Sequence, residues 1–261
     1  MIQKEFAKDN LRVLIFPNRQ AMGEGAGRIA AAYMVDLLRE KPEINVLFAA
    51  APSQNETLAY LKRCKEIDWS RVNAFHMDEY IGLQPDHPAG FGNFLCRSLF
   101  DALPFRSVNL INGNAPDIQE ETRRYAQLLH THPLDLTLMG VGENGHIAFN
   151  DPPVADFNDP LTVKTVELEE ACRRQQVNDG CFPQLSQVPT HAITVTIPAI
   201  LRAGLLVCSV PGTTKAAAIQ AMLEGEISTT CPASILRTHK NAFLFLDEAA
   251  AAAIQQPGDR I

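Results

Sequence analysis

The sequence predicts an α/β fold in which helices cover both faces of a mainly parallel sheet. Short apolar runs alternate with segments of helical periodicity over most of the 261 residues, a pattern typical of parallel strands joined by crossover helices. The apolar runs 134–139 and 205–210 are each followed by a turn that contains glycine, as expected where a strand ends. Because no repeat or low-complexity linker divides the chain, we expect one domain over residues 1–261.

Each expected element follows from its own local pattern. Strands are expected, in chain order, at Arg12–Phe16, Ile44–Ala50, Val72–Met77, Leu134–Met139, Thr162–Leu168, His191–Ile197, Leu205–Val210 and Ala242–Leu246. Helices are expected at Ala21–Arg39, Ser53–Lys65, Phe91–Leu103, Ile118–His130, Thr213–Leu223 and the alanine-rich Glu248–Gln255. Ser53 and Glu56 have the spacing of a capping box, so Ser53 is the expected N-cap of the second helix.

Composition excludes several classes of function. The chain has 23 Lys+Arg and 30 Asp+Glu, a formal net charge of −7, and no run of like charges. We therefore expect neither a nucleic-acid surface nor a polybasic membrane anchor. A small anionic ligand remains compatible with this charge, because it needs only one or two local cations.

The cysteines and the N-terminus indicate a cytoplasmic protein. Six cysteines are scattered without Cys-x-x-Cys spacing, which favours free thiols in a reducing compartment. The first ten residues are charged and lack the apolar core of a signal peptide, and no apolar run reaches transmembrane length.

The stretch 134–150 carries the most distinctive chemistry of the chain. After a short apolar strand, Gly140, Gly142 and Gly145 turn the backbone, and His146 follows directly. Ligands of open α/β sheets bind outside the carboxyl ends of the strands, so His146 is expected to touch a substrate. The alternative is a structural histidine in a loop.

Other interpretations of this stretch are disfavoured. Residues 140–145 match the glycine pattern of dinucleotide-binding sites, with Glu167 about 20 residues later. That pattern must open a helix, whereas Asp151 and the two prolines after it stop any helix within two turns. No clustered Cys/His spacing indicates a metal site, and the G-x-S-x-G pattern of serine hydrolases is absent. We expect neither a cofactor nor a metal.

Two further segments follow expected strands. Asp78 and Glu79 come directly after the 72–77 strand and should open onto the same edge as His146. A buried carboxylate beside a histidine suits proton transfer, although an acidic pair can also be a solvated turn. In the segment 210–215, Gly212 permits close approach of the backbone and Lys215 supplies charge, so a phosphate site and an ordinary capped helix are both compatible.

Five segments together resemble the glucosamine-6-phosphate deaminase/isomerase family. They are FHMDEYIGLQPDHPAGFGNFL, LMGVGENGHIAFNDP, VPTHAITVTIPAIL, PGTTKAAAIQAMLEG and CPASILRTHKN, in this order. The resemblance extends from about Arg12 to Ala249. It implies a Rossmann-like three-layer α/β/α domain, no cofactor, and a homo-oligomer. The implied reaction uses water to convert glucosamine 6-phosphate to fructose 6-phosphate and ammonia, which makes the enzyme formally a hydrolase.

The resemblance also implies roles for individual residues. Asp78 is similar to the base that moves a proton between C2 and C1, and His146 to the group that opens the sugar ring. Asn144 and Asp151 occupy the positions that orient this histidine, and Lys215 that of the phosphate-binding lysine. The expected substrate contacts are Glu79, Gly142, Gly145, Ala50, Ala51, Ser53 and Lys215.

The chain departs from the family pattern at three places. Asn144 and Asp151 replace an aspartate and a glutamate. The segment 49–55 lacks the glycine of the usual phosphate turn. The family's phosphate-binding arginine has no exact match, and Arg173 or Arg174 is the expected substitute.

Two alternative functions follow from relatives of the same fold. One is a lactone hydrolase of the 6-phosphogluconolactonase type, a sister family that usually carries different motifs at these positions. The other is a non-catalytic sugar-phosphate sensor. The sensor is disfavoured because Asp78 and His146 are both present and no DNA-binding segment is evident.

Overall fold

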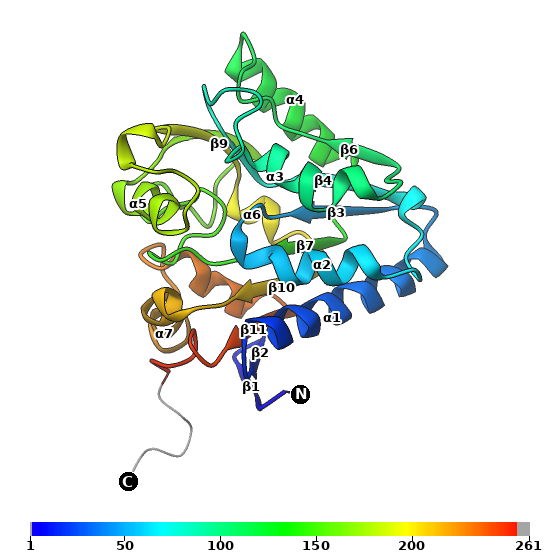
Figure 1. Ribbon diagram of the computed structural model, residues 1–261, viewed down its shortest axis with the longest axis vertical. Coiled ribbons are helices and arrows are strands. Elements are labelled where there is room, and N and C mark those ends of the chain that lie inside the picture. Colours follow the sequence, from blue (N-terminus) through cyan, green and yellow to red (C-terminus); the bar gives the residue numbers. More distant parts are fainter. Residues whose placement is uncertain (1, 255–261) are drawn as a thin grey trace.

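A large sheet of eight strands forms the centre of the computed structural model, which describes residues 2–254 (Figure 1). Its order is β1-β2-β11-β10-β7-β3-β4-β6. The strands are β1 (Lys4–Lys8), β2 (Leu11–Phe16), β3 (Ile44–Phe48), β4 (Val72–His76), β6 (Ser107–Asn109), β7 (Leu136–Met139), β10 (Leu205–Val210) and β11 (Ala242–Asp247). Only the edge pair β1–β2 is antiparallel, and the other neighbours run parallel.

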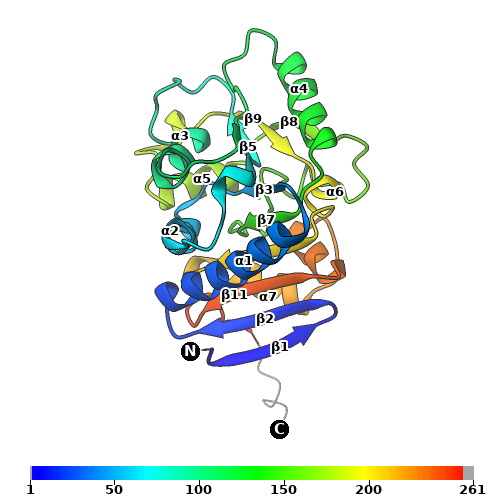
Figure 2. The same ribbon diagram turned by 90° about the vertical axis from the view of Figure 1, so that its right-hand side faces the viewer.

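Helices cover both faces of this sheet (Figure 2). They are α1 (Arg19–Glu40), α2 (Asn55–Arg63), α3 (Phe91–Ser98), α4 (Ile118–Thr131), α5 (Glu170–Asn178), α6 (Ile197–Ile200) and α7 (Ala216–Glu224). Side chains alternate along the central strands, so that Val46 and Phe48 pack into the apolar cluster under α1, α2 and α3, whereas Leu47 belongs to the cluster under α4, α6 and α7. The predicted three-layer α/β/α fold is therefore confirmed.

Two of the expected strands belong to a separate sheet. β8 (Val163–Glu167) and β9 (His191–Val195) pair antiparallel with each other, and the short strand β5 (Asp78–Tyr80) pairs with β9. The sequence does not indicate β5, because three residues are too few to show an alternating pattern. This small sheet holds Asp78 opposite Thr194.

Local differences from the expected elements have identifiable causes. Ser53 does not cap a helix, because it lies within a single 3₁₀ turn, Pro52–Gln54, and Glu56 pairs with Arg19 instead. Residues 248–254 form turns rather than a helix, and the carboxylate of Asp247 accepts the backbone N–H of Ala250 in the first of these turns. Gln255, the last residue of that expected helix, lies outside the described residues. The sequence also missed β1, β6 and α5.

Candidate active site

A cavity of about 220 Å³ opens at the carboxyl ends of β10, β7, β3 and β4, which are neighbours in the sheet. After β3 the chain adds strands on one side, and after β7 it adds them on the other, so this edge is the topological switch point where α/β proteins bind ligands. Of the residues expected to contact substrate, those that line the cavity are Ala50, Ala51, Ser53, Asp78, Gly142, His146 and Lys215.

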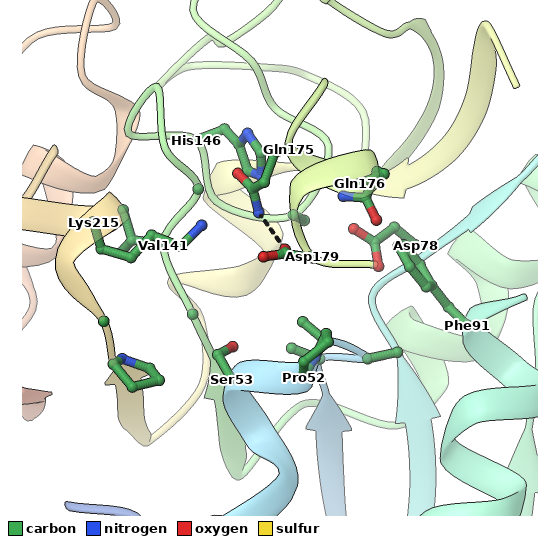
Figure 3. A pocket seen from close by; sticks show the side chains of 18 of the residues that line it. Pro52, Ser53, Asp78, Phe91, Val141, His146, Gln175, Gln176, Asp179 and Lys215 are labelled. Atoms are coloured by element: carbon green, nitrogen blue, oxygen red, sulfur yellow. Dashed lines mark hydrogen bonds between the residues drawn. The ribbon is translucent and has the colours of Figure 1, made fainter. Parts of the chain in front are cut away.

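Asp78 faces this cavity from the first position of β5 (Figure 3). Its residue is only 6% exposed, and no hydrogen bond from a described residue acts on its carboxylate. Burial, followed by the nearby charge of Glu79, raises the pKa of Asp78 well above its ordinary value. A carboxyl group in this state can both take up and return a proton near neutral pH.

His146 stands on the cavity wall with a carboxylate behind it. Its Nδ1 lies 2.9 Å from Oδ1 of Asp151, which leaves Nε2 for a ligand. Asn144 donates to the same carboxylate oxygen at 3.0 Å and accepts the backbone N–H of His146 at 3.1 Å. Burial raises the pKa of Asp151, but the contacts with His146 and Asn144 more than offset this effect and hold it below its ordinary value.

The glycines of the loop after β7 make room for this arrangement. A Cβ atom on Gly142 would lie 2.2 Å from Cε1 of His146, so the imidazole ring can pack there only against glycine. Gly145 has a φ of +83° and, unlike Gly142, does not line the cavity. No helix follows it, and the glycine pattern therefore lacks the context that a dinucleotide site requires.

Two cations line the other part of the cavity. Lys215 is buried at the end of a 3₁₀ turn before α7, and its Nζ has no hydrogen-bond partner among the described residues. Burial lowers its pKa, although the charges of Asp179 and Glu143 act in the opposite direction. The sequence did not single out Arg19, which comes from the start of α1 and donates to Glu56 and to the carbonyl of Pro52. An unpartnered buried ammonium is a ready site for an anion.

Several residues that were expected at the site do not line the cavity. Glu79 does not reach the cavity, since successive residues of a strand point to opposite sides. Neither arginine proposed for the phosphate lines the cavity either. Arg173 donates to the carbonyls of Leu185 and Val188, and Arg174 pairs with Glu170 on the surface. Asn144 and Asp151 also lie outside the cavity lining and contact it through His146.

The sequence missed the residues that α5 and its C-cap bring over the cavity. Gln175 accepts the backbone N–H of Glu143 at 2.7 Å and donates to the carboxylate of Asp179 at 3.2 Å, while Gln176 lies beside Asp78 (Figure 3). The α5 segment has no clear apolar periodicity that could have indicated its position.

Among the described residues, one group could hold a metal, and it consists of His146, Asp151 and Cys172.

Known proteins that are similar to this chain include sugar-phosphate enzymes. Residues 17–245 match the family model described as glucosamine-6-phosphate isomerases/6-phosphogluconolactonase. A glucosamine-6-phosphate deaminase of Exiguobacterium sp. (strain ATCC BAA-1283 / AT1b) is 39% identical over 229 residues, or 87% of each chain. The deaminase of Bacillus cereus (strain B4264) is 40% identical over 188 residues, 72% of this chain and 70% of that protein.

Solved structures share the fold. A monomeric glucosamine-6-phosphate deaminase is 30% identical and superposes with a TM-score of 0.83, covering 92% of this chain and 99% of its own. The 6-phosphogluconolactonase of Thermotoga maritima superposes with a TM-score of 0.73 over 90% of this chain and 98% of its own, but at 18% identity this likeness concerns the fold alone. The match over residues 17–245 and the relatives near 40% identity establish that the chain belongs to the glucosamine-6-phosphate isomerase/6-phosphogluconolactonase family.

Proposed function

We propose that this protein is a glucosamine-6-phosphate deaminase, which converts the amino-sugar phosphate and water to fructose 6-phosphate and ammonia. One observation carries the proposal beyond the names of its relatives. An unpartnered buried carboxyl group, Asp78, and a carboxylate-backed histidine, His146, face the same cavity, and a buried unpartnered ammonium, Lys215, lines it as well. An aldose–ketose isomerisation on a phosphorylated sugar needs these three groups.

The first step in the proposed mechanism is ring opening. His146 protonates the ring oxygen of the pyranose through Nε2 while the C1 hydroxyl loses its proton, which yields the open-chain aldehyde. Asp151, 2.9 Å from Nδ1, stabilises the imidazolium form of the ring. Asn144 acts on this step only by orienting the pair, because it contacts Asp151 and the His146 backbone.

Asp78 then carries out the isomerisation. Its carboxylate removes the proton from C2 while the aldehyde oxygen takes up the proton that the ammonium group of the substrate releases, which gives an enolamine. Asp78 then returns its proton to C1, and the nitrogen lone pair forms the double bond that makes C2 an iminium carbon. Water adds to this carbon, and ammonia leaves to give the ketose. The raised pKa of Asp78 matches this role, because it makes the carboxylate a stronger acceptor for the C2 proton.

The phosphate is proposed to bind Lys215, with Arg19 and the Ser53 turn beside it. The turn 51–54 has no glycine, but Ala51, Pro52 and Ser53 all line the cavity. Among the described residues, Arg19 lines this cavity, whereas Arg173 and Arg174 do not.

An assay of product formation tests the proposal. Purified protein is mixed with glucosamine 6-phosphate, and the ammonia and fructose 6-phosphate that form are both measured. The two products should appear in equal amounts. A parallel reaction with 6-phosphogluconolactone tests hydrolysis of the lactone. Turnover of the lactone alone would contradict the proposal, and so would binding of glucosamine 6-phosphate without either product, which is the behaviour of a sensor.

Assembly and location belong to the same proposal. None of the described helices is long and apolar enough to cross a membrane, and the six cysteines are free thiols. A cytoplasmic enzyme of one domain agrees with these features. A homo-oligomer remains a prediction, and because one similar structure is of a monomeric deaminase, light scattering at working concentration should decide between the two states.

A further inference from the structure

A third buried side chain lies beside the contact between His146 and Asp151. Cys172, on α5, brings its Sγ into a group in which the three potential ligand atoms all lie within 4.8 Å of one another. The exposed fractions are 8% for His146, 1% for Asp151 and 1% for Cys172. Cys172 does not itself line the cavity.

The three donors have the chemistry of a zinc site. Imidazole nitrogen, carboxylate oxygen and thiolate sulfur are the atoms that bind Zn²⁺ in proteins, whereas Mg²⁺ and Ca²⁺ prefer oxygen alone. Ligands at ordinary bond lengths around one tetrahedral zinc ion are about 3.3–3.8 Å apart. The spacings here, from 2.9 Å between His146 and Asp151 up to a limit of 4.8 Å, bracket that range. Small rotations of these side chains therefore suffice to place one ion among them.

We propose that His146, Asp151 and Cys172 form an inhibitory Zn²⁺ site. The ion replaces the proton between Nδ1 of His146 and Asp151, and the Cys172 thiol loses its proton on forming the zinc–sulfur bond. Both protons are released to solvent. Three protein ligands leave a fourth position for water. With Nδ1 bound to zinc and Asp151 withdrawn, His146 can no longer alternate between its neutral and protonated forms.

The consequence for activity rests on the proposed function, but binding of the metal does not. Zinc should inhibit the deaminase reversibly, and a chelator should restore activity. Mg²⁺ and Ca²⁺ should have no such effect, because neither favours thiolate and imidazole. This group cannot be predicted from sequence spacing, since its members are separated by 5 and 21 residues and no metal-binding pattern links them.

The test compares Cys172→Ser with Cys231→Ser. Cys231 is a matched control, because it is also buried and is not one of the three ligands. Its Sγ packs near Gly145, which belongs to the loop that carries His146. Zinc inhibition is measured for both variants and the wild type. Cobalt(II) is then added to the metal-free proteins, because a cobalt–thiolate bond gives a charge-transfer absorption that reports binding without any assay of activity.

The expected result is a half-inhibitory zinc concentration at least about tenfold higher in Cys172→Ser, with Cys231→Ser unchanged. The cobalt–thiolate absorption should appear in the wild type and in Cys231→Ser and be absent from Cys172→Ser. His146→Gln should weaken cobalt binding as well, which provides a second variant if Cys172→Ser does not fold. Equal zinc sensitivity of the two cysteine variants, or a cobalt spectrum without thiolate absorption in the wild type, would overturn the proposal. An inactive wild type that still binds cobalt through thiolate would instead count against the proposed function.

Discussion

Asp78 and Glu79 are adjacent acidic residues on one short strand, yet they have opposite surroundings. Asp78 faces the cavity and accepts no hydrogen bond from the described residues. Glu79 points to the other side and accepts the backbone N–H groups of Tyr80, Phe91 and Gly92 at 2.9–3.1 Å. A buried polar group that faces a cavity and has no hydrogen-bond partner is therefore a candidate catalytic group. A buried polar group whose hydrogen bonds are all made contributes instead to the stability of the fold.

Asp78→Asn should have the largest effect on activity. The amide keeps the volume of the side chain but cannot accept the C2 proton, so we expect kcat to fall by about 10²–10⁴-fold. Steady-state measurement of ammonia release checks this. A kcat within tenfold of the wild type would remove Asp78 from the mechanism and break the comparison with Glu79.

The same variant should be more stable than the wild type at neutral pH. The pKa of Asp78 is raised in the folded state, so the protonated carboxyl favours folding. That contribution is complete below the unfolded pKa of about 3.9 and is lost as the pH rises through the folded value. Asparagine cannot ionise, and the gain in melting temperature should therefore grow from acid to neutral pH. A lower melting temperature at pH 7 would contradict the raised pKa.

His146→Gln should follow, with a loss of about 10²-fold or more on glucosamine 6-phosphate. Its effect should depend on the form of the substrate. A 5-deoxy analogue lacks the oxygen that closes the pyranose ring, so the variant should lose much less activity with it. Asp78→Asn is the control, because it should lose activity equally with both compounds. An equal loss in His146→Gln would assign this histidine to a later step.

The sequence predicted the features that depend on local patterns, but not those that depend on contacts between distant segments. The alternation of strands and helices, and the placing of His146, Gly212 and Lys215 after strands, depend on local patterns and were confirmed by the fold. The small sheet of β5, β8 and β9 depends on pairing between distant segments, which the periodicity of each segment does not encode. Glu79 was expected at the site from the family resemblance, but in the strand β5 it follows Asp78 directly, so its side chain points to the other side.

The search for the phosphate-binding arginine failed for the same reason, because the position of an arginine in the sequence does not show which residues it contacts. Arg173 and Arg174 were favoured by their position in the sequence, but the first is bound to two carbonyls and the second is paired on the surface. Arg19 enters the cavity from α1, more than 150 residues away in the chain. Gln175, Gln176 and Asp179 likewise reach the cavity only through the path of α5, which no local pattern predicted.

Lys215→Ala should have an intermediate effect, mainly on KM. A charge-assisted bond to phosphate contributes about 1.5–3 kcal/mol in both the ground state and the transition state, so KM should rise by about 10- to 100-fold with little change in kcat. Because burial lowers the pKa of Lys215, the KM of the wild type should also rise at a pH below that at which ordinary lysines lose their charge. Arg174→Ala is the control and should leave KM unchanged. If Lys215→Ala also leaves KM unchanged, the phosphate lies elsewhere.

Glu79→Gln should have the smallest effect on activity. It tests directly whether Glu79, unlike Asp78, serves stability rather than catalysis. The amide oxygen can still accept some of the three N–H groups, but its own N–H₂ group meets donors rather than acceptors, so we expect a loss of about 1–3 kcal/mol in unfolding free energy. Catalysis at the pH optimum should stay within a few-fold of the wild type.

The pH profile of Glu79→Gln should nevertheless move in a defined direction. The charge of Glu79 is the second cause, after burial, of the raised pKa of Asp78. Removing that charge lowers the pKa of Asp78, so its carboxylate stays ionised to a lower pH. The acid limb of kcat/KM should therefore shift to lower pH, while the alkaline limb stays in place. A shift toward higher pH, or a loss of kcat as large as in Asp78→Asn, would mean that Glu79 takes part in the chemistry and that the two carboxylates act as a pair.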